Sequence, residues 1–240
     1  TMAGPAELRI ALVAPSHVYP MFEQALRIAA GEAPEEHRRR IGELWARFSQ
    51  VAAGNPHAWS REAVPAEQIW QPGPDNRMIS WPYTKLMNSN NMVDQGAALI
   101  LTSVGKAEAL RIPKERWVFP YAGTDAHDTY LIGERASFSG SPAIRIAGRR
   151  ALELTGLGID DIDTVDVYSC FPSAVQVAAR ELGLGLDDAA RPLTVTGGLT
   201  FAGGPWNNYV THSIATMAER GVSQMVSVDL ETAESFREAS

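Results

Sequence analysis

The sequence has 240 residues, 45% of them hydrophobic and 20% charged, which is enough for one large domain or two small ones. Its net charge of -7 argues against a nucleic-acid surface, because phosphate binding needs clustered Lys and Arg. A single cysteine excludes an internal disulfide and a thiolate-rich zinc site. No apolar run approaches the roughly 20 residues that span a bilayer, and no charged-then-apolar leader begins the chain, so we expect a cytoplasmic protein.

Residues 1–87 predict a helical and irregular region. A helix within 19–29 precedes a strongly amphipathic one at 34–53, whose apolar residues recur at three- and four-residue spacings. The basic run at 38–40 follows two glutamates in this helix, so we interpret it as a solvated face rather than a phosphate site. Residues 55–82 are rich in Pro, Trp, Asn and Gly and predict a long loop that is functional or covers a partner.

From about residue 88 the apolar runs begin to alternate with helical patterns. The strand candidates are 96–103, 117–121, 163–168, 193–195 and 224–230, and the helix candidates are 107–110, 141–155, 173–182 and 208–220. This alternation predicts an α/β fold over residues 88–220, with a largely parallel or mixed sheet and flanking helices. Residues 221–240 are left unassigned.

The first candidate for chemistry is Tyr168-Ser169-Cys170. These residues follow a predicted strand and precede a predicted helix, which places them at the carboxyl end of the sheet, where open α/β folds bind ligands. A phenol, a hydroxyl or a thiol could meet a substrate there. The alternative is that Cys170 and Phe171 simply pack, since free cysteine is among the most buried residue types, and the segment alone favours this interpretation.

The second candidate is the glycine-rich loop at 196–209, with four glycines in eight residues. Glycine allows positive φ and close backbone approach, and Asn207 or Asn208 can cap the following helix. Amides from Gly203 and Gly204 onward can bind an anion or a developing oxyanion at that helix start. The loop lacks the Lys and the spacing of nucleotide-binding loops. A tight structural turn is the alternative, but the concentration of Asn and Trp favours function.

Two histidines complete the candidate set. His127 and Asp128 follow the strand predicted at 117–121, and an Asp-His-Asp sequence can orient a general base or hold a metal. We predict no metal site, because the other histidines are scattered, and an Asp-capped turn with a surface His is an equal alternative. His212 lies in the first turns of the last helix, either as a base or in a local hydrogen bond.

Taken together, Tyr168-Ser-Cys-Phe171 and Gly197-Gly-Leu-Thr-Phe-Ala-Gly-Gly204-Pro resemble two motifs of the thiolase superfamily. The chain is most similar to the C-terminal portion of sterol-carrier-type thiolases and thiolase-like aldolases, and residues 1–87 resemble the loop domain of such proteins. At the position of Tyr168, ordinary thiolases have Asn, sterol-carrier-type thiolases have His and the aldolases have Tyr. The resemblance implies a partial thiolase-like layered fold, a coenzyme A thioester as substrate and no covalently bound cofactor.

Departures from the family pattern limit what the resemblance implies. Thiolases end this loop with Gly-His-Pro, whose His polarises the thioester oxygen, and here Gly204 stands in its place. The family's nucleophilic cysteine lies in an N-terminal half that this chain does not contain. Cys170 aligns with a position that is not nucleophilic, and residues 221–240 do not resemble the family's ending.

The resemblance implies acyltransferase-type C–C bond formation or thiolytic cleavage of 3-oxoacyl-CoA in lipid or sterol metabolism. Tyr168 and His212 would then lie closest to the reacting carbon as catalytic groups. The substrate-binding candidates around them are Ser169, Cys170, Gly203, Gly204, Asn207, Asn208, His127 and Asp128.

Two alternatives stay open. The first is a retro-aldol lyase acting on a 3-hydroxyacyl-CoA such as a steroid side chain, which needs no cysteine nucleophile because Tyr168 serves the hydroxyl or the enolate oxygen. The second is a non-catalytic CoA-binding or scaffolding protein. Thiolase-like enzymes are dimers or tetramers, and the related aldolases work with a small OB-fold partner. The resemblance therefore implies a homo-oligomer, with an OB-fold protein as a further partner.

Overall fold

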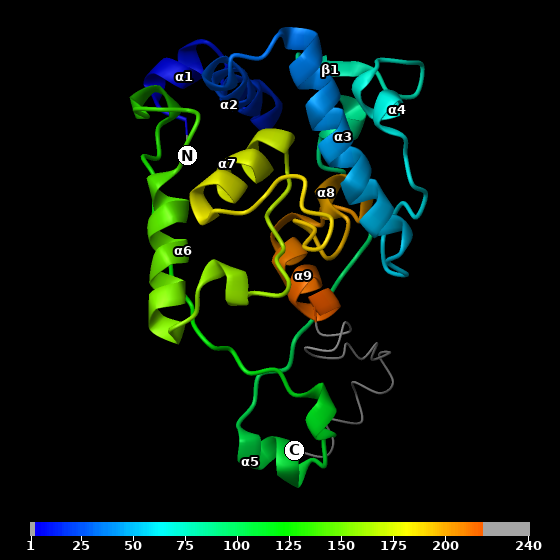
Figure 1. Ribbon diagram of the computed structural model, residues 1–240, viewed down its shortest axis with the longest axis vertical. Coiled ribbons are helices and arrows are strands. Elements are labelled where there is room, and N and C mark those ends of the chain that lie inside the picture. Colours follow the sequence, from blue (N-terminus) through cyan, green and yellow to red (C-terminus); the bar gives the residue numbers. More distant parts are fainter. Residues whose placement is uncertain (1–2, 218–240) are drawn as a thin grey trace.

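The computed structural model describes residues 3–217, and Figure 1 shows its elements. The first part contains α1 (Pro5–Arg9), α2 (Pro15–Ala30), α3 (Pro34–Ala53), α4 (Ala66–Trp70), β1 (Met78–Ser80) and β2 (Tyr83–Thr84). The second contains α5 (Val104–Ala109), α6 (Pro142–Thr155), α7 (Pro172–Leu182), α8 (Gly198–Phe201) and α9 (Tyr209–Met217). Short 3-10 turns lie at Lys85–Met87, Lys114–Arg116, Ile132–Glu134, Ile159–Asp161 and Trp206–Asn208.

Three of the long helices begin and end where the sequence predicts, whereas α2 begins at Pro15, four residues before the predicted start at 19. Proline occupies the first turn of α2, α3, α6 and α7, where its missing N–H costs no hydrogen bond. Gly31, Gly156 and Gly183 end α2, α6 and α7 in the left-handed conformation. The helices predicted at 34–53, 141–155 and 173–182 are therefore confirmed within one residue at each end.

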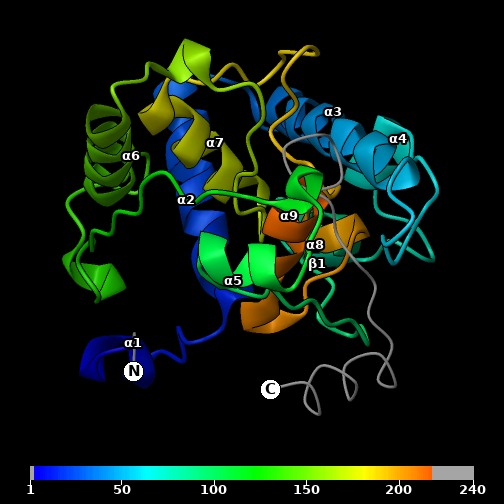
Figure 2. The ribbon, with the colours of Figure 1, turned by 90° about the horizontal axis from the view of Figure 1, so that it is seen from below.

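The core lies between α3, α7 and the glycine-rich loop. Ile41, Trp45 and Phe48 on one face of α3 are almost fully buried, as their spacing requires. The indole Nε1 of Trp45 donates to Thr200 Oγ1 at 3.0 Å, which attaches this helix to α8. In Figure 2 α4 lies alongside α3, and α6 lies alongside α7.

The large sheet predicted from the apolar runs is wrong for the described residues. Their one sheet is the antiparallel pair β1–β2, in which Met78 lies opposite Thr84. The predicted strands at 96–103, 117–121, 163–168 and 193–195 form no ladder, and the one at 224–230 lies outside the described residues. A strand needs a neighbour to satisfy its backbone groups, and between 163–168 and 193–195 only one backbone bond forms, from Val167 N to Leu193 O at 2.9 Å. The structure is a helix-rich α/β fold with a small sheet, so the predicted α/β class is confirmed.

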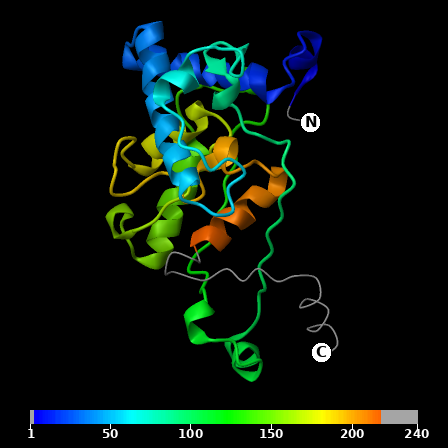
Figure 3. The same cartoon turned by 90° about the vertical axis from the view of Figure 1, so that its right-hand side faces the viewer.

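An extended arm carries two of those apolar runs away from the body, as Figures 1 and 3 show. The arm leaves the core after residue 97 and carries α5 at its far end. Ile100, Leu101 and Phe119 on the arm are 78%, 85% and 65% exposed, values that apolar side chains in packed strands do not have. Within residues 3–217, no helix combines the length and the apolar character that crossing a membrane requires.

A buried polar network joins α2, α3 and α7. His37 on α3 is fully buried, with Nε2 2.6 Å from Glu23 Oε1 and Nδ1 2.6 Å from Glu32 Oε2. Glu23 also accepts from Tyr83 OH at 2.7 Å and from Gln176 Nε2 at 2.6 Å. Tyr83 continues the chain of bonds to Ser173 Oγ at 2.8 Å, at the start of α7. The network thus fixes the helix that begins directly after Phe171.

Replacing Glu23 with Gln is expected to lower the free energy of unfolding by about 3 kcal/mol. The buried side chains of His37, Tyr83 and Gln176 would then lose the carboxylate that accepts their hydrogen bonds. Chemical denaturation measures this change. Glu43→Gln, on the exposed face of α3, is the matched control and should change stability by less than about 0.5 kcal/mol. Equal effects of the two substitutions would contradict a stabilising role for the network.

The pH dependence of the same network has a defined sign. Burial alone would raise the pKa of Glu32, but hydrogen bonds from His37 and Arg40 outweigh it and lower that pKa. Ionised Glu32 therefore stabilises the fold above the ordinary glutamate pKa near 4.3, and this contribution is lost as pH falls through the lower folded value. The stability difference between wild type and Glu32→Gln should shrink as pH is lowered across that window. Denaturation curves in which the difference grows instead would contradict this assignment.

Candidate functional site

The segment that carries Tyr168 is held by one carboxylate two residues before it. Asp166 accepts hydrogen bonds from Val195 N and Ser213 Oγ, both at 2.9 Å. It also accepts from Thr194 Oγ1 at 3.1 Å and from Tyr209 OH at 3.2 Å. Burial raises the pKa of Asp166, although the four donors oppose that shift. The carboxylate thereby connects three segments that are distant in sequence: 163–168, 193–196 and α9.

Tyr168 presents its phenol to solvent from the edge of this assembly. Its ring packs edge-on against Tyr209, with centroids 5.7 Å apart, and the residue is 47% exposed. Burial of the remainder, together with nearby Cys170, raises the pKa of Tyr168. The phenol is therefore protonated at neutral pH, and it can donate a hydrogen bond to an oxygen that gains negative charge.

Ser169 and Cys170 point into the protein. Ser169 is fully buried, and its Oγ accepts from Leu199 N at 3.2 Å, so it joins the Tyr168 segment to the glycine-rich loop. Burial raises the pKa of Cys170 to about 11, although a hydrogen bond from Tyr19 opposes the shift. A buried thiol with so high a pKa is a poor nucleophile at neutral pH, so the packing interpretation describes Cys170 best.

The glycine-rich loop packs directly against the Tyr168 segment. Gly198 has φ +77°, and a Cβ there would lie 2.6 Å from Phe48 Cδ1 and 2.7 Å from Ser169 Oγ. Gly203 has φ +110°, and a Cβ there would lie 2.1 Å from Gln95 Oε1. Both positions therefore require glycine for conformation and for space.

Several loop amides are already engaged within the protein. Gly204 N donates to Asn90 O at 2.8 Å, and Asn208 N donates to Pro205 O at 3.0 Å. The Asn208 side chain bonds the backbone of Ala97 in both directions, at 2.8 and 3.0 Å. The expectation that Gly204 and Asn208 offer free amides is therefore wrong, because neighbouring carbonyls saturate them. Asn207 is exposed in the 3-10 turn Trp206–Asn208, directly before α9.

The three remaining candidates lie in different surroundings. His212 on α9 is partly buried, and its Nε2 has no hydrogen-bond partner within residues 3–217. Burial and nearby His57 lower the pKa of His212, which keeps the imidazole neutral near pH 7.

His127 is exposed, with Nε2 3.9 Å from Asp125. Asp128 faces a separate cavity, where it binds Arg135 and Ser141.

The described residues thus bring the half-exposed Tyr168 phenol together with the glycine-rich loop through the Ser169–Leu199 bond, whereas the neighbour that acts on the neutral imidazole of His212 is His57. His, Cys, Asp and Glu side chains do not gather into a group of three that could hold a metal ion in this part of the chain. Sequence analysis did not identify Asp166 as a functional residue. The available signal is a charged residue inside the apolar segment 163–168, because a buried charge needs hydrogen-bond partners.

The lone cysteine offers a direct chemical test of this geometry. At pH 7 and 25 °C, Cys170 in the native protein is expected to react with iodoacetamide at least about 100-fold more slowly than in the denatured protein, because a pKa of about 11 leaves little thiolate. The native rate should rise as pH approaches 11. Mass spectrometry of the intact protein follows the reaction, and equal native and denatured rates would contradict the buried thiol.

Comparison with known proteins places the site in context. No family model matches the sequence. Among curated proteins, the chain is similar to the acetyl-CoA acetyltransferase of Methanocaldococcus jannaschii, with 26% identity over 132 residues, 55% of this chain and 32% of that protein. It is 34% identical to the acetyl-CoA acetyltransferase of Syntrophomonas wolfei over 118 residues, 49% of this chain and 27% of that protein.

Two solved structures extend the comparison to the fold. A monomeric SCP2-thiolase like protein type 1 from Mycobacterium smegmatis matches 90% of this chain and 47% of its own, with a TM-score of 0.83 and 38% identity. The Ltp2-ChsH2(DUF35) aldolase matches 90% of this chain and 58% of its own, with a TM-score of 0.68; its 20% identity establishes a shared fold alone. The chain spans about a third of the curated relatives and about half of these solved chains.

Proposed function

We propose that this thiolase-like chain forms one wall of an acyl-CoA thioester site. The premise is its similarity to part of the length of thiolase-like proteins. The observation that carries the proposal is the half-exposed Tyr168 phenol, held beside the glycine-rich loop by Asp166 and Ser169. The reaction proposed for the whole protein is acyltransferase-type C–C bond formation or thiolytic cleavage of a 3-oxoacyl-CoA. Acetyl-CoA acetyltransferases among the relatives support this class.

Tyr168 and His212 have complementary roles in this proposal. The protonated phenol donates to the thioester or enolate oxygen, where negative charge develops. The neutral imidazole of His212 accepts a proton from substrate. Because Cys170 is buried as a thiol, the nucleophile of an acyl-transfer step must come from outside the described residues.

A retro-aldol cleavage of a 3-hydroxyacyl-CoA is the second candidate. It needs an enolate-stabilising donor rather than a sulfur nucleophile, and the protonated Tyr168 phenol supplies that donor. The solved Ltp2-ChsH2(DUF35) aldolase is the corresponding structural neighbour. For such a chemistry we also propose a small partner protein, and for either chemistry a homo-oligomeric assembly in lipid metabolism.

The test compares wild-type protein with Tyr168→Phe by calorimetric titration of acetyl-CoA and of free CoA. The substitution is expected to weaken acetyl-CoA binding about fivefold, because a hydrogen bond contributes about 1 kcal/mol, and to leave CoA binding unchanged. Val210→Ala, on the exposed face of α9, is the matched control and should leave both affinities unchanged. Equal acetyl-CoA affinity in wild type and Tyr168→Phe would contradict the proposed role of the phenol.

Turnover assays separate the candidate functions. Full-length wild-type protein is supplied with acetoacetyl-CoA plus CoA, or with a 3-hydroxyacyl-CoA that carries a steroid side chain. Thiolysis supports the transferase, and release of a ketone or aldehyde supports the lyase. Binding of acetyl-CoA with neither product leaves the chain as a CoA-binding wall without catalysis of its own.

A further inference from the structure

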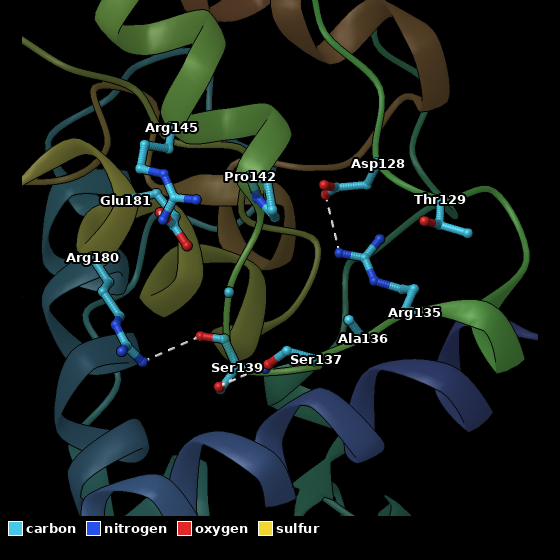
Figure 4. Close-up of a pocket in the computed structure, with 11 residues that line it drawn as sticks. Asp128, Thr129, Arg135, Ala136, Ser137, Ser139, Pro142, Arg145, Arg180 and Glu181 are labelled. Atoms are coloured by element: carbon cyan, nitrogen blue, oxygen red, sulfur yellow. Dashed lines mark hydrogen bonds and ion pairs between the residues drawn. The ribbon is translucent and has the colours of Figure 1, made fainter.

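A cavity lies at the C-terminal end of α7, and Tyr168 precedes the other end of this helix. Figure 4 shows the residues that line the cavity. It has a volume of about 530 Å³, within the range of small-molecule sites. The segment 128–140, the start of α6 and the end of α7 line it, and it is partly open to solvent. The cavity-lining Arg180 lies eight residues after Pro172, so about 12 Å of helix separates it from the start of α7.

Three arginines face this cavity from two sides. In Figure 4, Arg145 and Arg180 lie on one side and Arg135 on the other. Only two carboxylates, those of Asp128 and Glu181, line the same space, so three positive and two negative groups leave a net charge of +1. The cavity is therefore suited to an anion in a protein whose net charge is -7.

Both carboxylates are saturated by donors of the protein itself. Asp128 accepts from Arg135 Nη2 at 3.0 Å, from Ser141 Oγ at 2.5 Å and from Ala143 N at 3.1 Å. Glu181 accepts from Arg145 Nη1 at 3.2 Å and, through its other oxygen, from Ser141 N at 2.9 Å. Neither carboxylate has an oxygen left without a donor.

Arg180 has no carboxylate partner among residues 3–217. Arg180 is exposed, and its one hydrogen bond in that range is from Nη1 to the carbonyl of Ser139 at 3.4 Å, so most of its five N–H donors face solvent and are open to a ligand. The hydroxyls of Ser137 and Ser139 lie 3.1 Å apart on the same wall. Arg135 Nε is buried and has no partner in the described part of the chain. Guanidinium donors thus exceed the acceptors within the cavity.

We propose that this cavity binds a phosphomonoester of a small metabolite, separately from the acyl-CoA site. A phosphate group has three oxygens, and it can accept from the guanidinium groups of Arg180 and Arg145 and from a serine hydroxyl. The phosphate carries about two negative charges and offsets the net charge of +1 that the three arginines, Asp128 and Glu181 give the cavity, and the remaining volume accommodates the organic part. Arg180 is the residue on which binding depends most, because it has no competing carboxylate.

Calorimetric titration at fixed ionic strength tests the proposal with ribose 5-phosphate, inorganic phosphate and ribose. Wild-type protein is expected to bind the two phosphates and not ribose, and Arg180→Gln should weaken phosphate binding at least about tenfold. Arg149→Gln, an exposed arginine of α6 that pairs with Glu153 outside the cavity, should change nothing. Arg145→Gln provides a second cavity variant if Arg180→Gln does not fold.

The outcomes decide the proposal without reference to catalysis. Absence of phosphate binding by wild type up to about 10 mM, or equal losses in Arg180→Gln and Arg149→Gln, would overturn it. Because coenzyme A itself carries a phosphomonoester, separateness is tested by titrating acetyl-CoA into Arg180→Gln. Unchanged acetyl-CoA affinity supports an independent site, and a loss as large as that of phosphate binding would overturn it. Tyr168→Phe should leave phosphate binding intact, so failure of the acyl-CoA proposal would be seen separately.

Discussion

The Asp166 carboxylate is the interaction on which the candidate site depends. In a complete sheet, neighbouring strands would fix the segment that leads to Tyr168, but here one backbone bond joins residues 163–168 to residues 193–195. Four donors from 194–195 and α9 converge on Asp166 instead. A buried acceptor left without them would cost several kcal/mol, so these segments are held together as one unit. The orientation of the phenol follows from that unit.

Local signals made the helices predictable, whereas the sheet was not. Proline at the first turn and glycine after the last turn bound α6 and α7 closely, because both effects act within a few residues. The apolar run at 96–103 carries an equally clear strand pattern, but a strand forms only when another segment pairs with it. The exposed Leu101 shows that the described residues provide no such neighbour. Periodicity gives the tendency of a segment, and tertiary contacts decide the outcome.

The candidate site was partly predictable for the same reason. Sequence placed Tyr168 and the glycine-rich loop together, and the Ser169–Leu199 bond joins them. It did not reveal that Asn90 saturates the amide of Gly204, because that contact spans more than 100 residues of chain. Nor could spacing show that Asp128 faces a different cavity from Tyr168. Residue identity suggested chemistry, but the fold determined which groups share one space.

Burial decides the protonation states of Cys170 and His212 at neutral pH. Burial raises the pKa of Cys170 and lowers that of His212, because it disfavours the charged form in each case. The result is a chain with a hydrogen-bond donor and a neutral base but no thiolate. The central claim is that the Tyr168 segment and the glycine-rich loop face one acyl thioester. Hydrogen–deuterium exchange with and without acetyl-CoA tests it most directly: the account predicts new protection within 167–171 and 197–209, and protection confined to other segments, or none at all, would contradict it.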